Sequence, residues 1–209
     1  MTTGGDSACI DTADALEALY GPVAPTSILK EVDHIHPLYR PFIEAAPFAV
    51  LATAGSDGLD ASPRGDPAGF VTIEDDRTLV LPDRRGNNRI DSLRNIIADP
   101  RVALLFLIPG IGETLRVNGT GRIHAGPDDL ARYEVDGRVP KTLLRIHVTS
   151  VFFQCSRAII RSGLWTQAAH VTRDRLPSPG TILRAVSDQS FDGEAYDAAL
   201  PRRLADTLY

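Results

Sequence analysis

The sequence predicts a mainly β protein with flanking helices, built around a closed or partly closed antiparallel barrel. Three observations lead to this prediction. About six short strand-like segments lie between residues 48 and 153, tight Gly-, Pro- and Asp-rich turns separate them, and a single helix is expected among them. A parallel, doubly wound sheet would need a crossover helix after almost every strand, and the sequence lacks that pattern.

Composition limits the classes of protein to which the chain can belong. It has 209 residues, of which 43% are hydrophobic and 23% charged, so a single globular domain is expected. The formal net charge of −5 at pH 7 argues against a nucleic-acid binder, because such proteins present a basic face to phosphates. The cysteines, Cys9 and Cys155, are too few for a disulfide scaffold and indicate a reducing compartment, with Cys155 expected in the core.

No segment has the character of a membrane span or of a targeting peptide. The longest apolar run, Val102–Ile108, is much shorter than the ~18 residues that a membrane-spanning helix needs. The first turns of the chain, up to Tyr20, carry acidic side chains and no basic one, the reverse of a secretory signal. We therefore expect a soluble, cytoplasmic protein that does not bind membranes.

The chain is expected to form one domain with three parts. Residues 1–46 are a helical segment, residues 47–165 form the barrel, and residues 166–209 are a helical tail packed on it. The expected strands cover about residues 48–54, 59–62, 69–73, 78–81, 102–108, 114–124 and 144–153. The helices expected outside the barrel cover about residues 12–20, 27–33, 41–45, 181–188 and 194–208.

For two of these elements the sequence predicts further structural details. In the last long strand the alternation that begins at Leu144 slips by one residue before Val151, which indicates a β-bulge. The helix among the strands is expected from about residue 89 to 98, with Asn87 or Asn88 as its N-cap. Its buried stripe is predicted to consist of Ile90, Leu93 and Ile97.

The strongest chemical signal is an arginine-rich turn at residues 81–89, between a strand and that helix. A helix N-terminus offers free N–H groups and a partial positive charge, so it favours a phosphate. Arg84, Arg85 and Arg89 would add bidentate donors. A solvated basic turn that only caps the helix is the alternative, and the spacing leaves both open.

Two further motifs have a chemical and a structural interpretation. The turn Ser62–Pro67 presents Arg64 and Asp66, either toward a ligand or as a local ion pair. The segment Arg161–Trp165 holds the single tryptophan, which could pack in a core or interface or stack on a planar ligand. The five histidines show no metal-binding spacing, so no metal site is expected, and no residue stands out as catalytic.

Taken in order, these motifs resemble the FMN-binding split barrel of the pyridoxamine 5′-phosphate oxidase-like family. The segments that carry the resemblance are residues 61–70, 81–95, 99–102 and 112–119, together with the Arg-Ser-x-Leu-Trp segment at 161–165, typical of a bacterial branch of flavoproteins. The resemblance covers most of the chain. It implies an antiparallel split barrel of Greek-key type, FMN as the cofactor and a homodimer with FMN at the interface.

The resemblance also implies which residues bind the cofactor. Arg64 would bind the FMN phosphate, the backbone of Gly65 and Asp66 would lie near the flavin, and Leu81 and Pro82 would touch the isoalloxazine edge. The turn residues expected around the phosphate are Arg84, Asn87, Asn88 and Arg89. The residues expected at the interface, reaching the flavin from the partner subunit, are Glu113, Thr114, Arg161 and Trp165.

The function implied is that of an FMN-dependent oxidoreductase acting on a small molecule. The oxidase itself binds the phosphate of its substrate with a C-terminal Arg-x-His segment, and residues 201–209 contain nothing that matches this segment. Pyridoxamine phosphate is therefore not the expected substrate. The alternative is a non-catalytic flavin or haem binder or sensor, for which His124 or His147 would have to supply the axial ligand of a haem.

Overall fold

A computed structural model describes residues 8–56 and 58–209, and the chain divides into two compact units at Glu31 and Val32. The described part of the first unit holds helices α1 (Ala13–Tyr20) and α2 (Pro25–Leu29). Helix α1 begins as its sequence predicts, because the Thr12 hydroxyl accepts a hydrogen bond from the Ala15 N–H at 3.3 Å. It ends at Gly21, which adopts a φ of 71°.

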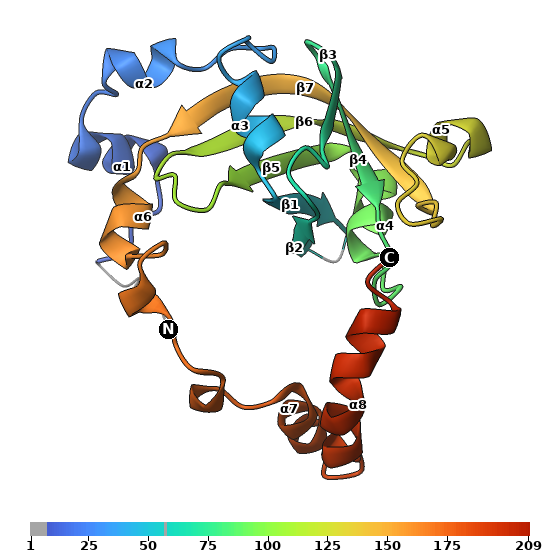
Figure 1. Cartoon of the computed structure of the whole chain (residues 1–209). Coiled ribbons are helices and arrows are strands. Elements are labelled where there is room, and N and C mark those ends of the chain that lie inside the picture. The colour runs from blue at the N-terminus through green and yellow to red at the C-terminus, as the bar shows by residue number, and fades with distance from the viewer. Residues whose placement is uncertain (1–7, 57) are drawn as a thin grey trace. The chain divides into compact units, whose positions relative to one another are not determined.

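The second unit is built on one seven-stranded sheet in which every neighbouring pair is antiparallel, in the order β2-β1-β5-β6-β7-β4-β3 (Figure 1). The predicted mainly β fold with flanking helices is confirmed. The strands are β1 (Phe48–Gly55), β2 (Gly58–Gly65), β3 (Thr72–Asp75), β4 (Thr78–Asp83), β5 (Arg101–Leu107), β6 (Thr114–His124) and β7 (Thr142–Gln154). The α-helices are α3 (Arg40–Ala45), α4 (Asp91–Ala98), α5 (Pro127–Ala131), α6 (Arg157–Ser162), α7 (Pro179–Val186) and α8 (Gly193–Asp206). Two short 3₁₀ helices cover Gln167–Ala169 and Arg173–Arg175.

Alternation along the strands gives the sheet one buried apolar face. In β5, Val102, Leu104 and Phe106 are buried, while the residues between them are half-buried. In β6 the same alternation buries Leu115 and Val117, which are both 1% exposed. These side chains belong to one core cluster that joins strands from both halves of the sheet. None of the helices in the described residues is long and apolar enough to cross a bilayer.

The predicted bulge in β7 is confirmed. The register pairs Asn118 with Ser150 and Gly119 with Val148, so Thr149 is the extra residue on β7. The bulge brings the two backbones close together at Gly119. A Cβ atom added there would lie 2.2 Å from the carbonyl oxygen of His147, so no side chain fits without a shift of the backbone.

Two predictions about burial are wrong. Helix α4 buries Ser92 and Ile96, whereas Ile90 and Ile97 are exposed, because two residues of positive φ before the helix set its phase differently from the expected stripe. Ile90 itself occupies the N-cap position, with no side-chain cap. Cys155, expected in the core, is exposed, because it follows the last residue of β7, beyond the covered part of the sheet.

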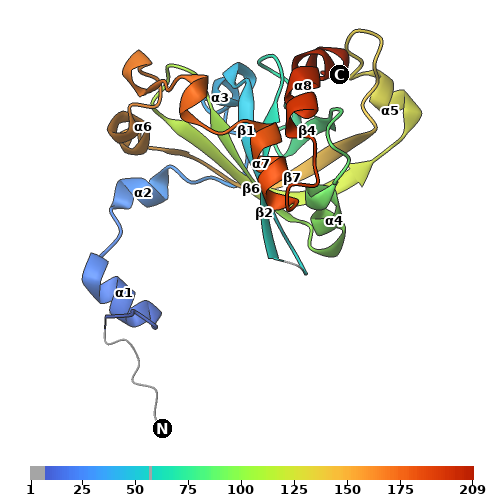
Figure 2. The same cartoon turned by 90° about the horizontal axis from the view of Figure 1, so that it is seen from below.

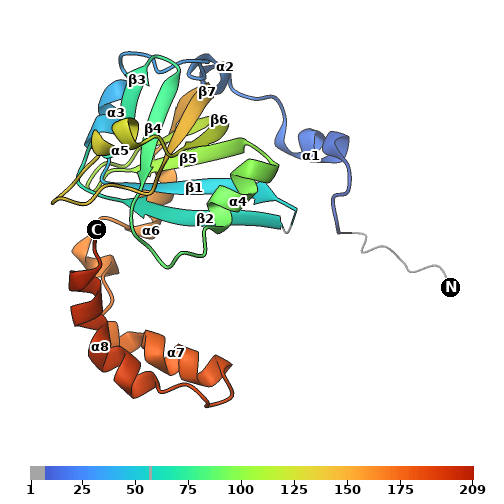
Figure 3. The ribbon, with the colours of Figure 1, turned by 90° about the vertical axis from the view of Figure 1, so that its right-hand side faces the viewer.

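Helices α7 and α8 lie side by side (Figure 3) and contact each other through bare backbone. A Cβ atom at Gly180 would lie 2.1 Å from the carbonyl oxygen of Gly193, so only glycine allows this approach. The carboxylate of Asp197 on α8 accepts hydrogen bonds from the Gly180 N–H at 2.8 Å and from the Ser178 hydroxyl. Beyond α8 the chain returns to the end of β4 (Figures 1 and 2).

Candidate functional site

A cleft of about 730 Å³ lies where the ends of β2 and β4 meet the start of α4. Its volume falls within the range of about 300–1,000 Å³ that is usual for small-molecule sites. The structure brings most of the predicted cofactor-binding residues into this one cleft. The predicted residues that line it are Arg64, Gly65, Leu81, Pro82, Arg84, Asn87, Asn88 and Arg89. Asp66 lies directly beside it, because its carboxylate is paired with Arg84 Nε at 2.8 Å.

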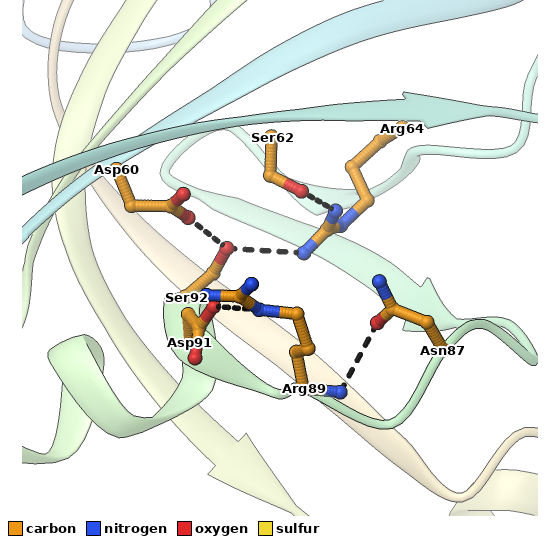
Figure 4. A network of polar contacts seen from close by, with 7 residues as sticks. All are labelled: Asp60, Ser62, Arg64, Asn87, Arg89, Asp91 and Ser92. Atoms are coloured by element: carbon orange, nitrogen blue, oxygen red, sulfur yellow. Dashed lines mark hydrogen bonds and ion pairs between the residues drawn. The ribbon is translucent and has the colours of Figure 1, made fainter. Parts of the chain in front are cut away.

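Arg64 is fixed at the cleft wall by a short polar network (Figure 4). Strand periodicity places Asp60, Ser62 and Arg64 on the same, half-buried face of β2. The Arg64 guanidinium donates to the Ser62 hydroxyl through Nη1 and to the Ser92 hydroxyl through Nη2 at 3.3 Å. Ser92 in turn donates to Asp60 Oδ2 at 2.6 Å. The Ser92 hydroxyl on α4 therefore links two side chains of β2, the carboxylate of Asp60 and the guanidinium of Arg64.

The loop before α4 turns its backbone toward the cleft. Asn88 and Ile90 adopt φ values of 58° and 53°, in the left-handed region, and α4 begins immediately afterwards at Asp91. The Arg89 N–H donates to Asn87 Oδ1 at 3.1 Å, while its guanidinium Nε donates to Asp91 Oδ2 at 2.7 Å. Because the Arg89 side chain is 76% exposed, this ion pair is weak and Arg89 is free to turn to a ligand.

The electrostatics of the cleft favour an anion. Five basic side chains line it against three acidic ones, namely Arg64, Arg84, Arg85, Arg89 and Lys141 against Asp60, Asp83 and Asp91. Burial lowers the pKa of Arg64, an effect that the nearby carboxylates of Asp83 and Asp60 oppose, and an arginine stays charged at any pH of interest. Burial also raises the pKa of Asp83, against the opposing charges of Arg64 and Lys141.

A second cavity of about 330 Å³ adjoins the cleft. The two share Asp83, Arg84, Arg85, Asn88 and Lys141 as lining residues. The residues found only in the second cavity come from the β6–β7 connection and from the chain beyond α8, and they are Arg138, Val139, Pro140 and Tyr209. The second cavity is therefore also rich in positive charge.

The residues expected from the partner subunit do not line the cleft of their own chain. Trp165 is half-buried and donates from Nε1 to the Ile111 carbonyl at 2.7 Å. Thr114 pairs with Gln154 at one end of β7, whereas Asp83, which lines the cleft, pairs with Thr142 at the other end. These ends are about 40 Å apart along the strand at ~3.3 Å per residue.

Other ligand chemistry finds no support in the part of the chain that the structure describes. Its residues contain no cluster of three or more potential metal ligands. No histidine is among the residues that line the cleft, so neither His124 nor His147 is placed to ligate a haem there.

Three residues at the site were not among those predicted, namely Asp60, Ser92 and Tyr209. Asp60 could have been found because it lies four positions before Arg64 and therefore on the same face of a strand. Ser92 was hidden by the incorrect phase of the helix. Tyr209 carries no local signal, since its partner Asp66 is 143 positions away.

The antiparallel sheet with its flanking helices has the fold of a split barrel, and a comparison with protein families agrees. The family model described as pyridoxamine 5′-phosphate oxidase matches residues 35–155, which include all seven strands. This chain belongs to that family. Among curated proteins no relative matches it.

Solved structures with a similar fold are distant in sequence. HupZ of Group A Streptococcus is 23% identical, with 58% of this chain and 95% of that chain covered and a TM-score of 0.47. A Clostridium acetobutylicum protein of the pyridoxinephosphate oxidase family, related to general stress protein 26, is 13% identical, with 56% and 84% covered and a TM-score of 0.44. General stress protein 26 of Bacillus anthracis is 17% identical, with 55% and 88% covered and a TM-score of 0.38.

Proposed function

We propose that this protein binds FMN in the cleft between β2, β4 and α4 and uses it as an oxidoreductase. The observation that supports the proposal most strongly is the convergence of Arg64, the 87–89 turn and the start of α4 on one cationic cleft. A phosphate group bound there would accept hydrogen bonds from guanidinium groups and from the N-terminus of a helix, which are donors that bind such anions in proteins. Membership of the pyridoxamine 5′-phosphate oxidase family supports the same ligand.

The protein's own residues would hold and orient the cofactor. Arg64 approaches the phosphate from β2, already aligned by Ser62 and Ser92, and Arg89 turns to it from the loop before α4. The buried strand end at Leu81 and Pro82 offers an apolar wall for the isoalloxazine ring. Bound FMN supplies the hydride or electron transfer, so the cleft needs few acid–base groups of its own.

We further propose that the working unit is a homodimer. Trp165 and Glu113 do not line the cleft of their own chain, so one chain does not carry them to its own flavin. A second copy related by a twofold axis can place them there, and each copy would then complete the site of the other.

The reaction is proposed to involve a small molecule other than pyridoxamine phosphate. The Arg-x-His segment with which the oxidase grips its substrate has no match in residues 201–209. Arg85, Arg138 and Lys141 nevertheless surround the second cavity, so a substrate that carries negative charge is suited to it. Pyridoxamine phosphate therefore belongs in the same assay as other donors and acceptors.

The test begins with the visible spectrum of the purified protein and with titration of the apoprotein with FMN. We expect a flavin spectrum, saturable FMN binding and much weaker binding of riboflavin, which lacks the phosphate. Bound flavin is then reduced anaerobically with NADH, NADPH or dithionite, and acceptors are screened. A Soret band or a failure to bind FMN would contradict the proposal, and FMN binding without turnover of any acceptor would favour the non-catalytic flavin binder.

A further inference from the structure

We propose that Tyr209 is a positioning residue that fastens the segment beyond α8 onto the rim of the cofactor cleft and so keeps bound flavin shielded from solvent. The proposal rests on FMN binding in that cleft. It assigns to α7 and α8 a role in the site, although neither helix contributes a residue to the cleft itself.

Tyr209 is joined to the most buried ion pair at the rim. Its phenol donates to Asp66 Oδ1 at 2.7 Å, while Asp66 Oδ2 accepts from Arg84 Nε at 2.8 Å. The Asp66 and Arg84 side chains are only 5% and 19% exposed, unlike the surface ion pairs of this protein. One carboxylate therefore holds β4 and the segment beyond α8 to the turn that follows β2.

Two further interactions hold the same residue. The Arg84 guanidinium lies 5.8 Å from the centre of the Tyr209 ring, within the range of cation–π contacts. Arg138, from the β6–β7 connection, donates through Nη1 to the carbonyl oxygens of Tyr209 and Asp206. Segments from three distant parts of the chain thus converge on Tyr209.

The anchored residue forms a wall next to the cleft. Tyr209 lines the second cavity, which shares Arg84 and Asp83 with the cofactor cleft. Arg84 Nη1 also donates to the Tyr133 carbonyl at 2.6 Å, so Arg84 connects the anchor to the β6–β7 connection. The hydrogen bond to Asp66 raises the pKa of Tyr209, so the phenol keeps the proton that it donates at neutral pH. Loss of the hydrogen bond between Tyr209 and Asp66 would release Tyr209 from the rim and expose the bound flavin to solvent.

The variant Tyr209→Phe tests the anchor because it removes only the hydroxyl. Tyr196→Phe is the matched control, since Tyr196 lies on α8 but packs against Phe191 and Arg203. Hydrogen exchange of the apoproteins is measured first. We expect exchange in residues 204–209 to rise about threefold to tenfold in Tyr209→Phe and to stay unchanged in Tyr196→Phe. Arg138→Ala, which weakens the anchor from the other side, should act in the same direction.

The second readout uses bound flavin. With FMN loaded, we expect iodide to quench flavin fluorescence several times more strongly in Tyr209→Phe than in wild type, and FMN to dissociate faster. Equal exchange in wild type and Tyr209→Phe would overturn the anchor, and equal quenching would overturn the shielding. If the wild type itself binds no FMN, both the proposed function and the shielding proposal are refuted. If the wild type binds FMN but quenching is equal in the two proteins, only the shielding proposal is refuted.

Discussion

Arg64 and Ser92 connect strand β2 to helix α4 across 28 positions of sequence, through a hydrogen bond of 3.3 Å from Nη2 to Oγ. Ser92 is 4% exposed, and its hydroxyl accepts a hydrogen bond from Arg64 and donates one to Asp60. A guanidinium that is held in this way loses little conformational freedom when it binds a phosphate. The connection therefore orients the Arg64 guanidinium before any ligand arrives.

Replacing Arg64 or Arg89 with alanine should weaken FMN binding by about tenfold to a hundredfold. The reason is that each substitution removes hydrogen bonds from a cationic donor to the phosphate, worth ~1.5–3 kcal/mol. Fluorescence titration of the apoproteins with FMN measures the change. Arg94→Ala is the control, since Arg94 is exposed on α4 and does not line the cleft. Unchanged affinity in both Arg64→Ala and Arg89→Ala would refute the assignment of the phosphate site.

Ser92→Ala should reduce both stability and FMN affinity. The substitution leaves Asp60 without its donor and Arg64 without one of its acceptors in a partly buried place, which costs about 1–3 kcal/mol of the free energy of unfolding. Affinity should fall less than in Arg64→Ala, because the guanidinium remains but is no longer aligned. Urea unfolding and FMN titration measure the two effects, with the exposed Ser162→Ala as control. A stability loss with unchanged affinity would show that Ser92 does not orient Arg64.

Local signals in the sequence predict most of the barrel. Strand β6 was located to the residue because its apolar and polar residues alternate without a break, and the β7 bulge because the alternation slips once. Helix α4 was misphased because its start depends on Asn88 and Ile90 adopting positive φ, which neither residue type requires. A hydrophobic stripe assumes regular helix throughout, so the burial of Ser92 was hidden.

The residues of the candidate site also divide into those that the sequence signals and those that it does not. Apart from Arg64, which lies on β2, the arginines and asparagines of the cleft lie between the end of β4 and the start of α4, where their residue types signal anion binding. Tyr209 and Arg138 reach the rim only through tertiary packing, because Tyr209 contacts Asp66 across 143 positions of sequence and Arg138 across 71. No periodicity or short motif records such a contact.

Asp83→Asn should stabilise the apoprotein at neutral pH but not in acid. Burial raises the pKa of Asp83, so its carboxylate favours the folded state only while protonated, and that contribution is lost as the pH rises through the raised pKa. The amide carries no charge and escapes this loss. Melting temperatures measured from pH 3.5 to 8 should separate as the pH rises, whereas the exposed Asp76→Asn should follow wild type. Curves that stay parallel over the whole range would contradict the prediction.

Gly119→Ala should destabilise the barrel by about 1–3 kcal/mol or more. Its Cβ would lie 2.2 Å from the carbonyl oxygen of His147, on the backbone of the neighbouring strand, so relief requires the bulge to move. Gly126→Ala is the control, because nothing lies within 4 Å of a Cβ there. The midpoint of denaturant unfolding should be much lower for Gly119→Ala than for Gly126→Ala. Equal midpoints would count against the described register.

The homodimer makes a prediction that single variants cannot test. If Trp165 of one copy completes the cleft that holds Arg64 of the other, Arg64→Ala and Trp165→Ala should each weaken every FMN site in their own homodimers. Mixing the two variants under conditions of subunit exchange should produce heterodimers in which one site has both defects and the other has none. About half of the dimers would then be mixed, so about a quarter of all sites should regain wild-type affinity.

Stoichiometric titration of the mixed variants with FMN measures this recovery, and sedimentation equilibrium establishes the oligomeric state of each sample. Within one chain, Trp165 does not line the cleft that Arg64 lines, which is why recovery is expected only from exchange between chains. Mixing Arg64→Ala with Arg89→Ala is the control, because both residues line the same cleft and every mixed dimer would still have one defect in each site. Recovery in that control as well, or tight FMN binding by a monomer, would refute the shared site.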